Sequence, residues 1–412
     1  MGAQPDGLDV PPGGPLPPGH QVDPSTTLSA YLHVPFCTTR CGYCDFNTYT
    51  ATELGEPADA PGLGMSSWLH GMHSEIDTAA SQLHALGDQR PLGTVFVGGG
   101  TPSLVPADDM AGLLDHLRTA FGLAADAEVT TEANPESTTP EWLEGLRAGG
   151  FNRLSLGMQS AKQHVLALLE RQHTPGRALQ VVQWAREQGF DDVSLDLIMG
   201  TPGESSDDFR ASLEAVIGAG VDHTSVYSLI VEEGTRFAAK VRRGEIPMPS
   251  DDDHAEKYLL AEQLLTSAGF ENYEVSNWAR PRPGRAHRSV HNLAYWRSQD
   301  WWGFGPGAHS HVNGVRWWNH KHPTKYTRAL AEGAPAAVGH ELLTGAQRHE
   351  ERVLLELRIA DGMPLAELDP DERSRLDPWV SSGHAVIADH RVRLTLPGRL
   401  LADGIVLDVL AG

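Results

Sequence analysis

Cysteine is scarce in this chain. Only three of the 412 residues are cysteines, and an odd number leaves at least one thiol unpaired in any disulfide scheme. The sequence therefore does not describe a small secreted domain that is held together by disulfides. Free thiols are typical of a reducing compartment, so we expect a cytoplasmic protein.

Long apolar runs and early basic residues are also missing. No stretch of about 18 consecutive apolar residues occurs, which predicts no transmembrane helix. No Lys or Arg precedes Arg40, and no apolar segment typical of a signal peptide precedes the first motif. Basic residues are few overall: 32 Lys and Arg against 54 Asp and Glu give a net charge of −22. Such a charge repels phosphate backbones, so we expect no nucleic-acid substrate.

The few cysteines stand together. Cys37, Cys41 and Cys44 fall within eight consecutive positions, in a loop expected after the first strand. These spacings let three thiolates converge on one metal centre. A four-iron cluster with three protein ligands keeps one iron open for a small molecule. Two alternatives remain open here: a zinc site with His33 as its fourth ligand, and three unrelated buried cysteines.

The cysteine segment also carries a family resemblance. Residues 31–46 read YLHVPFC followed by TTRCGYCDF. This pattern resembles the radical S-adenosylmethionine superfamily, and within it the family of HemW and oxygen-independent coproporphyrinogen III oxidase-like proteins. The likeness recurs in separate motifs over about residues 28 to 400. It implies a [4Fe-4S] cluster on Cys37, Cys41 and Cys44, with S-adenosylmethionine at the open iron.

Predicted strands and helices alternate from residue 28 onward. Six apolar, β-rich runs are separated mostly by amphipathic helical stretches, which predicts an α/β fold with a parallel sheet. The family resemblance implies that this sheet is a partial (β/α)6 barrel with its chemistry at the carboxyl ends of the strands. The six runs cover residues 28–34, 94–97, 127–131, 153–158, 193–198 and 224–230.

The same patterns divide the chain into four segments. Residues 1–27 are rich in Pro and Gly and are expected to form a disordered leader. The barrel is expected over 28–280, and a His- and Trp-rich connecting segment over 281–326. Residues 327–412 are expected to form a smaller C-terminal α+β domain, with a hairpin at 385–395 that suggests a winged-helix-like module. Because the chain is acidic, we expect this module to cover the active site or dock a partner rather than bind DNA.

Glycines and polar residues follow the predicted strands. Successive glycines at 98–100 let backbone groups approach a ligand closely. Carboxylates suit hydroxyl or amine groups, and a cation suits a carboxylate. Each residue taken alone is equally compatible with a turn, capping or packing role. The resemblance implies that S-adenosylmethionine is bound by Tyr31, Tyr43, Gly99, Gly100, Thr101, Glu132, Gln159, Arg171, Asp196 and Ile230.

Position 46 separates two branches of the family. Oxygen-independent coproporphyrinogen III dehydrogenases carry a further cysteine two residues after the third, whereas this chain has Phe46. HemW-type heme chaperones resemble this chain at that position. The resemblance therefore favours a heme chaperone, and the dehydrogenase, which decarboxylates propionates oxidatively, stays as the alternative. An RNA-modifying radical enzyme is a third class, which the negative charge disfavours.

A second motif favours the same branch. Residues 291–296 read HNLAYW and resemble the HNxxYW motif associated with heme binding in HemW. A neutral imidazole is a common axial ligand of heme iron. The resemblance implies heme contacts from His291, Tyr295 and Trp296, although a structural role for this histidine remains the alternative. It further implies three partners: heme, a heme-acceptor protein such as a respiratory one, and an electron donor such as flavodoxin or ferredoxin.

Overall fold

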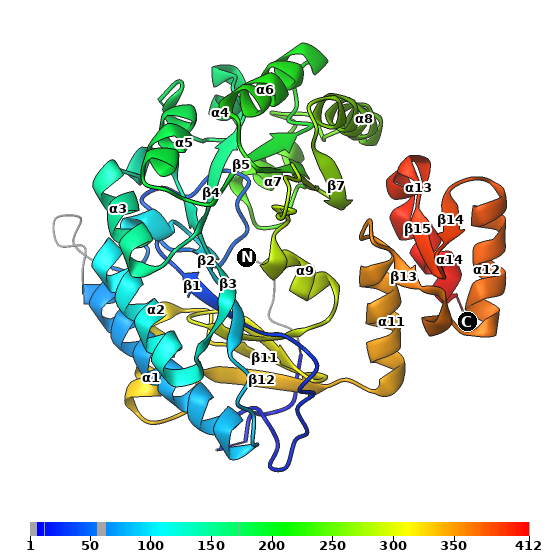
Figure 1. The fold of residues 1–412 in the computed structure, drawn as a ribbon. Coiled ribbons are helices and arrows are strands. Elements are labelled where there is room, and N and C mark those ends of the chain that lie inside the picture. Colours follow the sequence, from blue (N-terminus) through cyan, green and yellow to red (C-terminus); the bar gives the residue numbers. More distant parts are fainter. Residues whose placement is uncertain (1–5, 12, 56–62, 173, 412) are drawn as a thin grey trace.

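The chain folds around one large sheet, which Figure 1 shows curving inside a layer of helices. The computed structural model describes residues 6–11, 13–55, 63–172 and 174–411. The sheet has twelve strands in the order β12-β11-β10-β9-β1-β2-β3-β4-β5-β6-β8-β7. Its parallel part confirms the predicted α/β class and consists of β1 (Leu28–Val34), β2 (Leu92–Gly99), β3 (Leu123–Ala133), β4 (Arg153–Gln159), β5 (Asp192–Met199) and β6 (His223–Ser228).

Helices cover the outer face of the sheet because the strands bury alternate side chains against them. On β1, Ala30, Leu32 and Val34 belong to the main core together with Trp68 and Met72 of the first helix. None of the described helices combines the length and apolar composition that crossing a lipid bilayer requires. The helices of this part are α1 (Leu63–Ala85), α2 (Ala107–Phe121), α3 (Pro140–Gly149), α4 (Gln163–Leu168), α5 (Arg177–Glu187), α6 (Ser206–Ala219), α7 (Arg236–Arg242) and α8 (Asp251–Ser267).

Local sequence signals set the helix ends, as α6 illustrates. Ser205 accepts a hydrogen bond from the Asp208 backbone N–H, and the Asp208 carboxylate accepts one from the Ser205 backbone in return. This capping box satisfies two donors that the first turn leaves without partners. The helix stops at Gly220, whose φ of 68° lies in the left-handed region that glycine adopts at no steric cost.

The predicted connecting segment at 281–326 is part of the main sheet. β9 pairs in parallel with β1, and three further strands continue the sheet in antiparallel fashion. The main body therefore extends to residue 342, beyond the predicted boundary. Short strands rich in Trp and His lack a clean polar-apolar alternation, which is why their pattern did not reveal them. The added elements are β7 (Glu271–Glu274), β8 (Asn277–Ala279), α9 (Val290–Trp296), β9 (Asp300–Phe304), β10 (His309–Val312), β11 (Val315–Asn319), α10 (Pro323–Ala331) and β12 (Ala337–Leu342).

A small C-terminal unit has a core of its own, built around Val353, Leu357, Val392 and Ile405. Figure 1 shows it beside the barrel, on the side of α9 and β7. The hairpin predicted at 385–395 is present. The elements are α11 (Gly345–Glu356), β13 (Met363–Pro364), α12 (Pro370–Ser381), β14 (Ala385–Ala388), β15 (Arg391–Leu394), α13 (Leu396–Leu400) and α14 (Ala402–Leu410).

The described part of the predicted leader lies against the barrel. Leu16 is only 7% exposed and joins the main core. A ring nitrogen of His20 lies 3.0 Å from the carbonyl oxygen of Val312, and Leu8 pairs with His340 on the edge strand β12. The structure thus differs from the predicted disorder, because composition averages over a segment and overlooks single anchoring residues such as Leu16.

Candidate cluster and cofactor site

The three cysteines lie in the loop that follows β1. All three are half-buried free thiols, and they line one cavity of about 360 Å³. Backbone hydrogen bonds anchor the loop on both sides: Cys37 N–H donates to Tyr49 over 3.0 Å, and Gly42 N–H donates to Leu169 over 3.2 Å. The loop is therefore held in a fixed position while its sulfurs face a common space.

Two polar groups contact the sulfurs. A guanidinium nitrogen of Arg171 lies 3.3 Å from Cys41 Sγ, and the Thr101 hydroxyl lies 3.5 Å from Cys37 Sγ. Such donors stabilise thiolates. Burial nevertheless raises the pKa of Cys37, and it raises the pKa of Cys44 to about 11. These thiols thus stay protonated at neutral pH until a metal displaces the protons, which fits metal ligation better than a role as a free nucleophile.

The predicted S-adenosylmethionine residues gather around the same cavity, because the carboxyl ends of parallel strands meet at one edge. They come from β2 to β6 and the residues just after these strands, from the cluster loop and, for Arg171, from the segment after α4. All except Tyr31 line the cavity: Tyr43, Gly99, Gly100, Thr101, Glu132, Gln159, Arg171, Asp196 and Ile230.

The glycine loop after β2 packs directly against the cluster loop. Gly99 has a φ of 110°, and a Cβ added there would lie 2.6 Å from Cε1 of His33. A Cβ added to Gly100 would lie 2.5 Å from the carbonyl oxygen of Phe36. Both positions therefore require glycine, and the resulting backbone is open to the cavity.

Two half-buried carboxyl groups face the cavity. Glu132 accepts a hydrogen bond from Gly99 N–H over 3.0 Å, and Asp196 accepts one from the Ser155 hydroxyl over 3.0 Å. Burial raises the pKa of Glu132 to about 7 and also raises the pKa of Asp196. Both groups can therefore accept hydrogen bonds from amine or hydroxyl groups of a ligand, and the charge of Glu132 responds to pH near neutrality.

Sequence reasoning missed the role of His33. Burial lowers its pKa to about 4, so the ring is neutral. Its Nε2 lies 2.8 Å from the carbonyl oxygen of Asn47 and must donate, so Nδ1 accepts from the Tyr31 hydroxyl over 3.0 Å. Neither ring nitrogen is left for a zinc ion, which removes the proposed fourth ligand. Tyr31 itself faces a deeper chamber of about 180 Å³ rather than the cofactor cavity.

Asn47 is a second residue that the sequence did not reveal. Its side-chain N–H₂ group donates to the carbonyl oxygens of Pro306 over 2.9 Å and Lys321 over 2.8 Å. The cluster loop is thereby joined to the turn after β9 and to the segment before α10. A single asparagine three residues beyond Cys44 carries no pattern that could have predicted this contact.

The predicted heme residues lie on α9, where His291 is buried and Tyr295 and Trp296 are half-buried. His291 is 1% exposed, and its ring nitrogens lie 2.7 Å from the Thr94 hydroxyl and 2.9 Å from the Tyr295 hydroxyl. Burial lowers the pKa of His291 to about 3. Trp296 packs against a small apolar cluster that includes Ile359. Iron ligation by His291 remains a prediction and requires one of these two hydrogen bonds to break.

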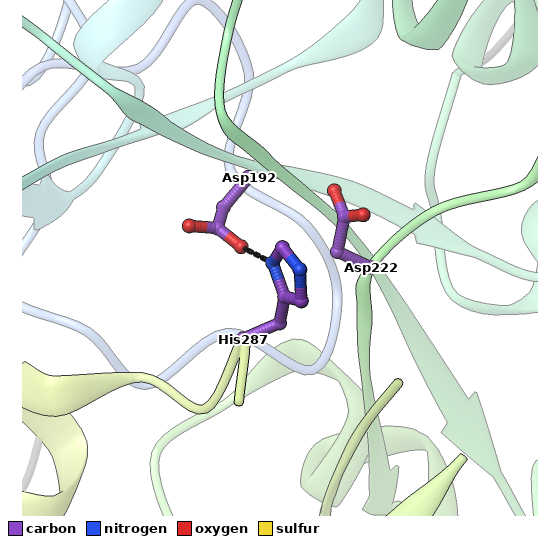
Figure 2. Close-up of side chains that lie close together, drawn as sticks. All are labelled: Asp192, Asp222 and His287. Carbon is purple, nitrogen blue, oxygen red and sulfur yellow. Dashed lines mark hydrogen bonds and ion pairs between the residues drawn. The ribbon is translucent and has the colours of Figure 1, made fainter. Parts of the chain in front are cut away.

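A buried cluster at the opposite edge of the barrel resembles a metal site in composition. Figure 2 shows Asp192, Asp222 and His287 close together, with the Asp192 carboxylate bonded to the His287 ring. These residues lie near the amino ends of β5 and β6, away from the cysteines. Four guanidinium groups already pair with the two carboxylates, so we interpret the cluster as an ion-pair network that stabilises the fold. They belong to Arg153, Arg186, Arg282 and Arg285.

Comparison with other proteins agrees with this geometry. The Radical SAM superfamily profile matches residues 31–216. The chain is 49% identical to the heme chaperone HemW of Mycobacterium tuberculosis, over 95% of this chain and 97% of that relative. It is 34% identical to the heme chaperone HemW of Bacillus subtilis, over 91% of this chain and 97% of that relative.

The fold has a solved counterpart. It is similar to the coproporphyrinogen III oxidase HemN of Escherichia coli, with a TM-score of 0.75 and 24% identity, over 94% of this chain and 91% of that one. At this identity the likeness concerns the fold alone, and it confirms the radical SAM fold that the resemblance implied. The sequence identity to the HemW proteins extends over nearly the whole chain. The chain therefore belongs to the HemW family of the radical SAM superfamily.

Proposed function

We propose that the protein is a cytoplasmic heme chaperone that binds a [4Fe-4S] cluster, S-adenosylmethionine and heme, and passes heme to an acceptor protein such as a respiratory one. The observation that carries this proposal is one cavity lined by three thiols and by the polar ends of several strands. The full-length similarity to relatives named heme chaperone HemW supports the heme part.

The residues present fit an iron–sulfur cluster and its cofactor. Cys37, Cys41 and Cys44 would hold the cluster, and Arg171 and Thr101 would stabilise their thiolates. When bound in this way, the cluster supplies a single electron at an iron that has no protein ligand. The electron donor would be a carrier such as flavodoxin or ferredoxin.

The remaining cavity residues would orient S-adenosylmethionine. Glu132 and Asp196 would accept hydrogen bonds from its amine or ribose hydroxyls, and the Gln159 amide would form a hydrogen bond with a hydroxyl group. Ile230, which is 66% exposed at this cavity, would pack on the adenine. The cavity measures about 360 Å³, within the roughly 300–1,000 Å³ of small-molecule sites, and a second cavity of about 1000 Å³ adjoins it at Cys41, Thr101 and Arg171.

Heme would then bind outside this cavity. The deeper chamber beside His291 measures about 180 Å³, which is below the roughly 300 Å³ at which such sites begin. Binding through His291, Tyr295 and Trp296 would therefore require α9 to move. A Soret band that changes in His291→Ala supports this site, and an unchanged band and affinity would exclude His291 as the ligand.

Oxygen-independent coproporphyrinogen III dehydrogenase is the second candidate, and the similarity of the fold to HemN keeps it in view. Phe46 lines the cavity at the position where the dehydrogenase pattern has a cysteine. This difference argues against the dehydrogenase function. One experiment tests both functions: anaerobic reconstitution, followed by hemin titration and a coproporphyrinogen assay on the same sample. We expect stoichiometric hemin binding without protoporphyrinogen, whereas robust turnover would contradict the chaperone function.

A further inference from the structure

One stretch of this acidic chain contains no acidic residue. The chain has 54 Asp and Glu, yet none occurs from residue 301 to residue 331. The same stretch contains Arg316, Lys321, Lys325 and Arg328. It forms β9, β10, β11 and α10 and the turns between them. Arg316 pairs with Glu341 and Glu351, so the excess positive charge of this stretch lies around α10, on a molecule whose net charge is −22.

The positive charge is displayed on α10. This helix buries Pro323, Tyr326 and Ala329, while Lys325 and Arg328 are exposed. Within the ranges that the structure covers, no carboxylate oxygen lies within 4.0 Å of the side-chain nitrogens of either cation. Burial lowers the pKa of His320, and the charges of Lys325 and Arg328 lower it further, so all three lie together. We call residues 320–328 the α10 face.

The α10 face adjoins the cluster loop. The Asn47 side chain donates to the Lys321 carbonyl oxygen over 2.8 Å, and the Tyr49 and His322 rings lie 5.3 Å apart between their centres. Tyr49 in turn accepts a hydrogen bond from the backbone N–H of Cys37 over 3.0 Å. Tyr49 therefore links the backbone of a cluster ligand to this basic surface.

A second basic element beside the same loop is partly neutralised. Phe237 of α7 donates its backbone N–H to Gly42 over 2.9 Å, so this helix also contacts the loop. Arg236 and Lys240, however, both pair with Glu170, at 2.7 Å and 2.6 Å. Acidic residues also flank α7, with Glu232 and Glu233 before it and Glu245 after it, whereas residues 301–331 contain none. An acidic partner is therefore attracted to the α10 face rather than to α7.

We propose that the α10 face docks an acidic one-electron carrier protein that reduces the cluster. The carrier loses one electron, the cluster gains one, and no atom is transferred. Unlike charges raise the rate of encounter and orient the partner, and salt weakens both effects. An anionic membrane would also meet a positive surface, but the short path through Tyr49 to Cys37 favours a redox partner. The inference rests on the proposed cluster.

The test measures how fast the reconstituted full-length protein is reduced. Photoreduced flavodoxin serves as the acidic carrier and dithionite as a small reductant, with cluster bleaching followed by anaerobic stopped flow at low and high salt. The variant is Lys325→Glu/Arg328→Glu, and the matched control on α7 is Arg242→Glu/Arg243→Glu. We expect the α10 variant to be reduced by flavodoxin about tenfold more slowly at low salt, with reduction by dithionite unchanged.

Three results would overturn the inference. In the first, flavodoxin reduces the α10 variant at a rate within about twofold of the wild-type rate. Electrostatic attraction of the carrier predicts a rate at least about tenfold lower. In the second, the α7 control loses as much rate as the α10 variant. In the third, the α10 variant loses binding to phosphatidylglycerol vesicles while its reduction is unaffected. A wild-type sample that dithionite does not bleach contradicts the proposed cluster itself and is thereby distinguished from all three.

Discussion

The two edges of the barrel use similar residue types for opposite purposes. At the amino edge, Asp192 and Asp222 form ion pairs with guanidinium groups and a histidine. At the carboxyl edge, Glu132 and Asp196 face a cavity without a basic partner in direct contact, apart from backbone and hydroxyl donors. A saturated ion network stabilises a fold, whereas incompletely paired polar groups beside thiols are available for a ligand.

The largest effect is expected from removing a cluster ligand. Cys41→Ala leaves two thiols at the carboxyl edge, so the cluster should no longer assemble, and the iron–sulfur absorbance after anaerobic reconstitution should be lost. Because Cys41 is half-buried, the circular dichroism of the variant should match that of the wild type. His287→Ala at the amino edge is the control and should keep its cluster. Equal cluster content in both variants would contradict the claim that the cluster is held at the carboxyl edge alone.

The amino edge should respond in stability instead. Asp222 is fully buried and bonded to Arg186, Arg282 and the backbone of Val193. Asp222→Asn should lower the free energy of unfolding by about 3 kcal/mol, because the hydrogen bonds that the buried carboxylate accepts from Arg186 and from the Val193 backbone lose their charge assistance. Urea titration measures this loss, and the folded variant should still take up a cluster. A loss of cluster content with unchanged stability would contradict our interpretation of this network.

The chamber beside His291 should make the stability of the protein depend on pH. The pKa of His291 is about 3, against an ordinary value of 6.5, because burial disfavours its charged form. The unfolded chain therefore binds the proton more tightly, and stability is present above pH 6.5 and is lost as the pH falls toward 3. From pH 7 to pH 5, the wild type should lose about 2 kcal/mol relative to His291→Gln in urea titrations. Parallel pH profiles would show that His291 is accessible to protons in the folded state.

The smallest effect concerns the cofactor. Glu132→Gln keeps the shape of the side chain but removes its negative charge from the cavity. S-adenosylmethionine should bind about tenfold more weakly at pH 8, because a charge-assisted hydrogen bond is replaced by a neutral one. The difference should shrink below the pKa of about 7, where the wild-type carboxyl is also neutral. Equilibrium dialysis at both pH values measures it, with Glu128→Gln at the amino edge as the matched control.

Much of the site was predictable because its signals are local in sequence. The cysteine spacing, the glycine run and the polar residue at each strand end are short patterns, and a parallel sheet brings strand ends together without further information. The hydrophobic alternation of β1 likewise marks Ala30 and Leu32 as core residues. Short-range patterns of this kind predicted the sheet and the lining of the cavity.

The contacts that the sequence did not reveal are long-range. Asn47 meets Lys321 across 274 positions, and Thr94 meets His291 across 197. No spacing rule links such residues, so a motif that resembles a heme-binding surface gave no sign of its burial. The sheet extension by β9 to β12 was missed for the same reason, since β9 pairs with β1 from the other end of the chain.

The central claim is that Cys37, Cys41 and Cys44 hold a four-iron cluster that keeps one iron open to S-adenosylmethionine. Electron paramagnetic resonance of the reduced, anaerobically reconstituted protein tests this claim most directly, with the spectrum recorded before and after addition of S-adenosylmethionine. We expect a [4Fe-4S] signal that shifts when the cofactor is added. A signal that does not respond, or a protein that retains only zinc, would contradict the account.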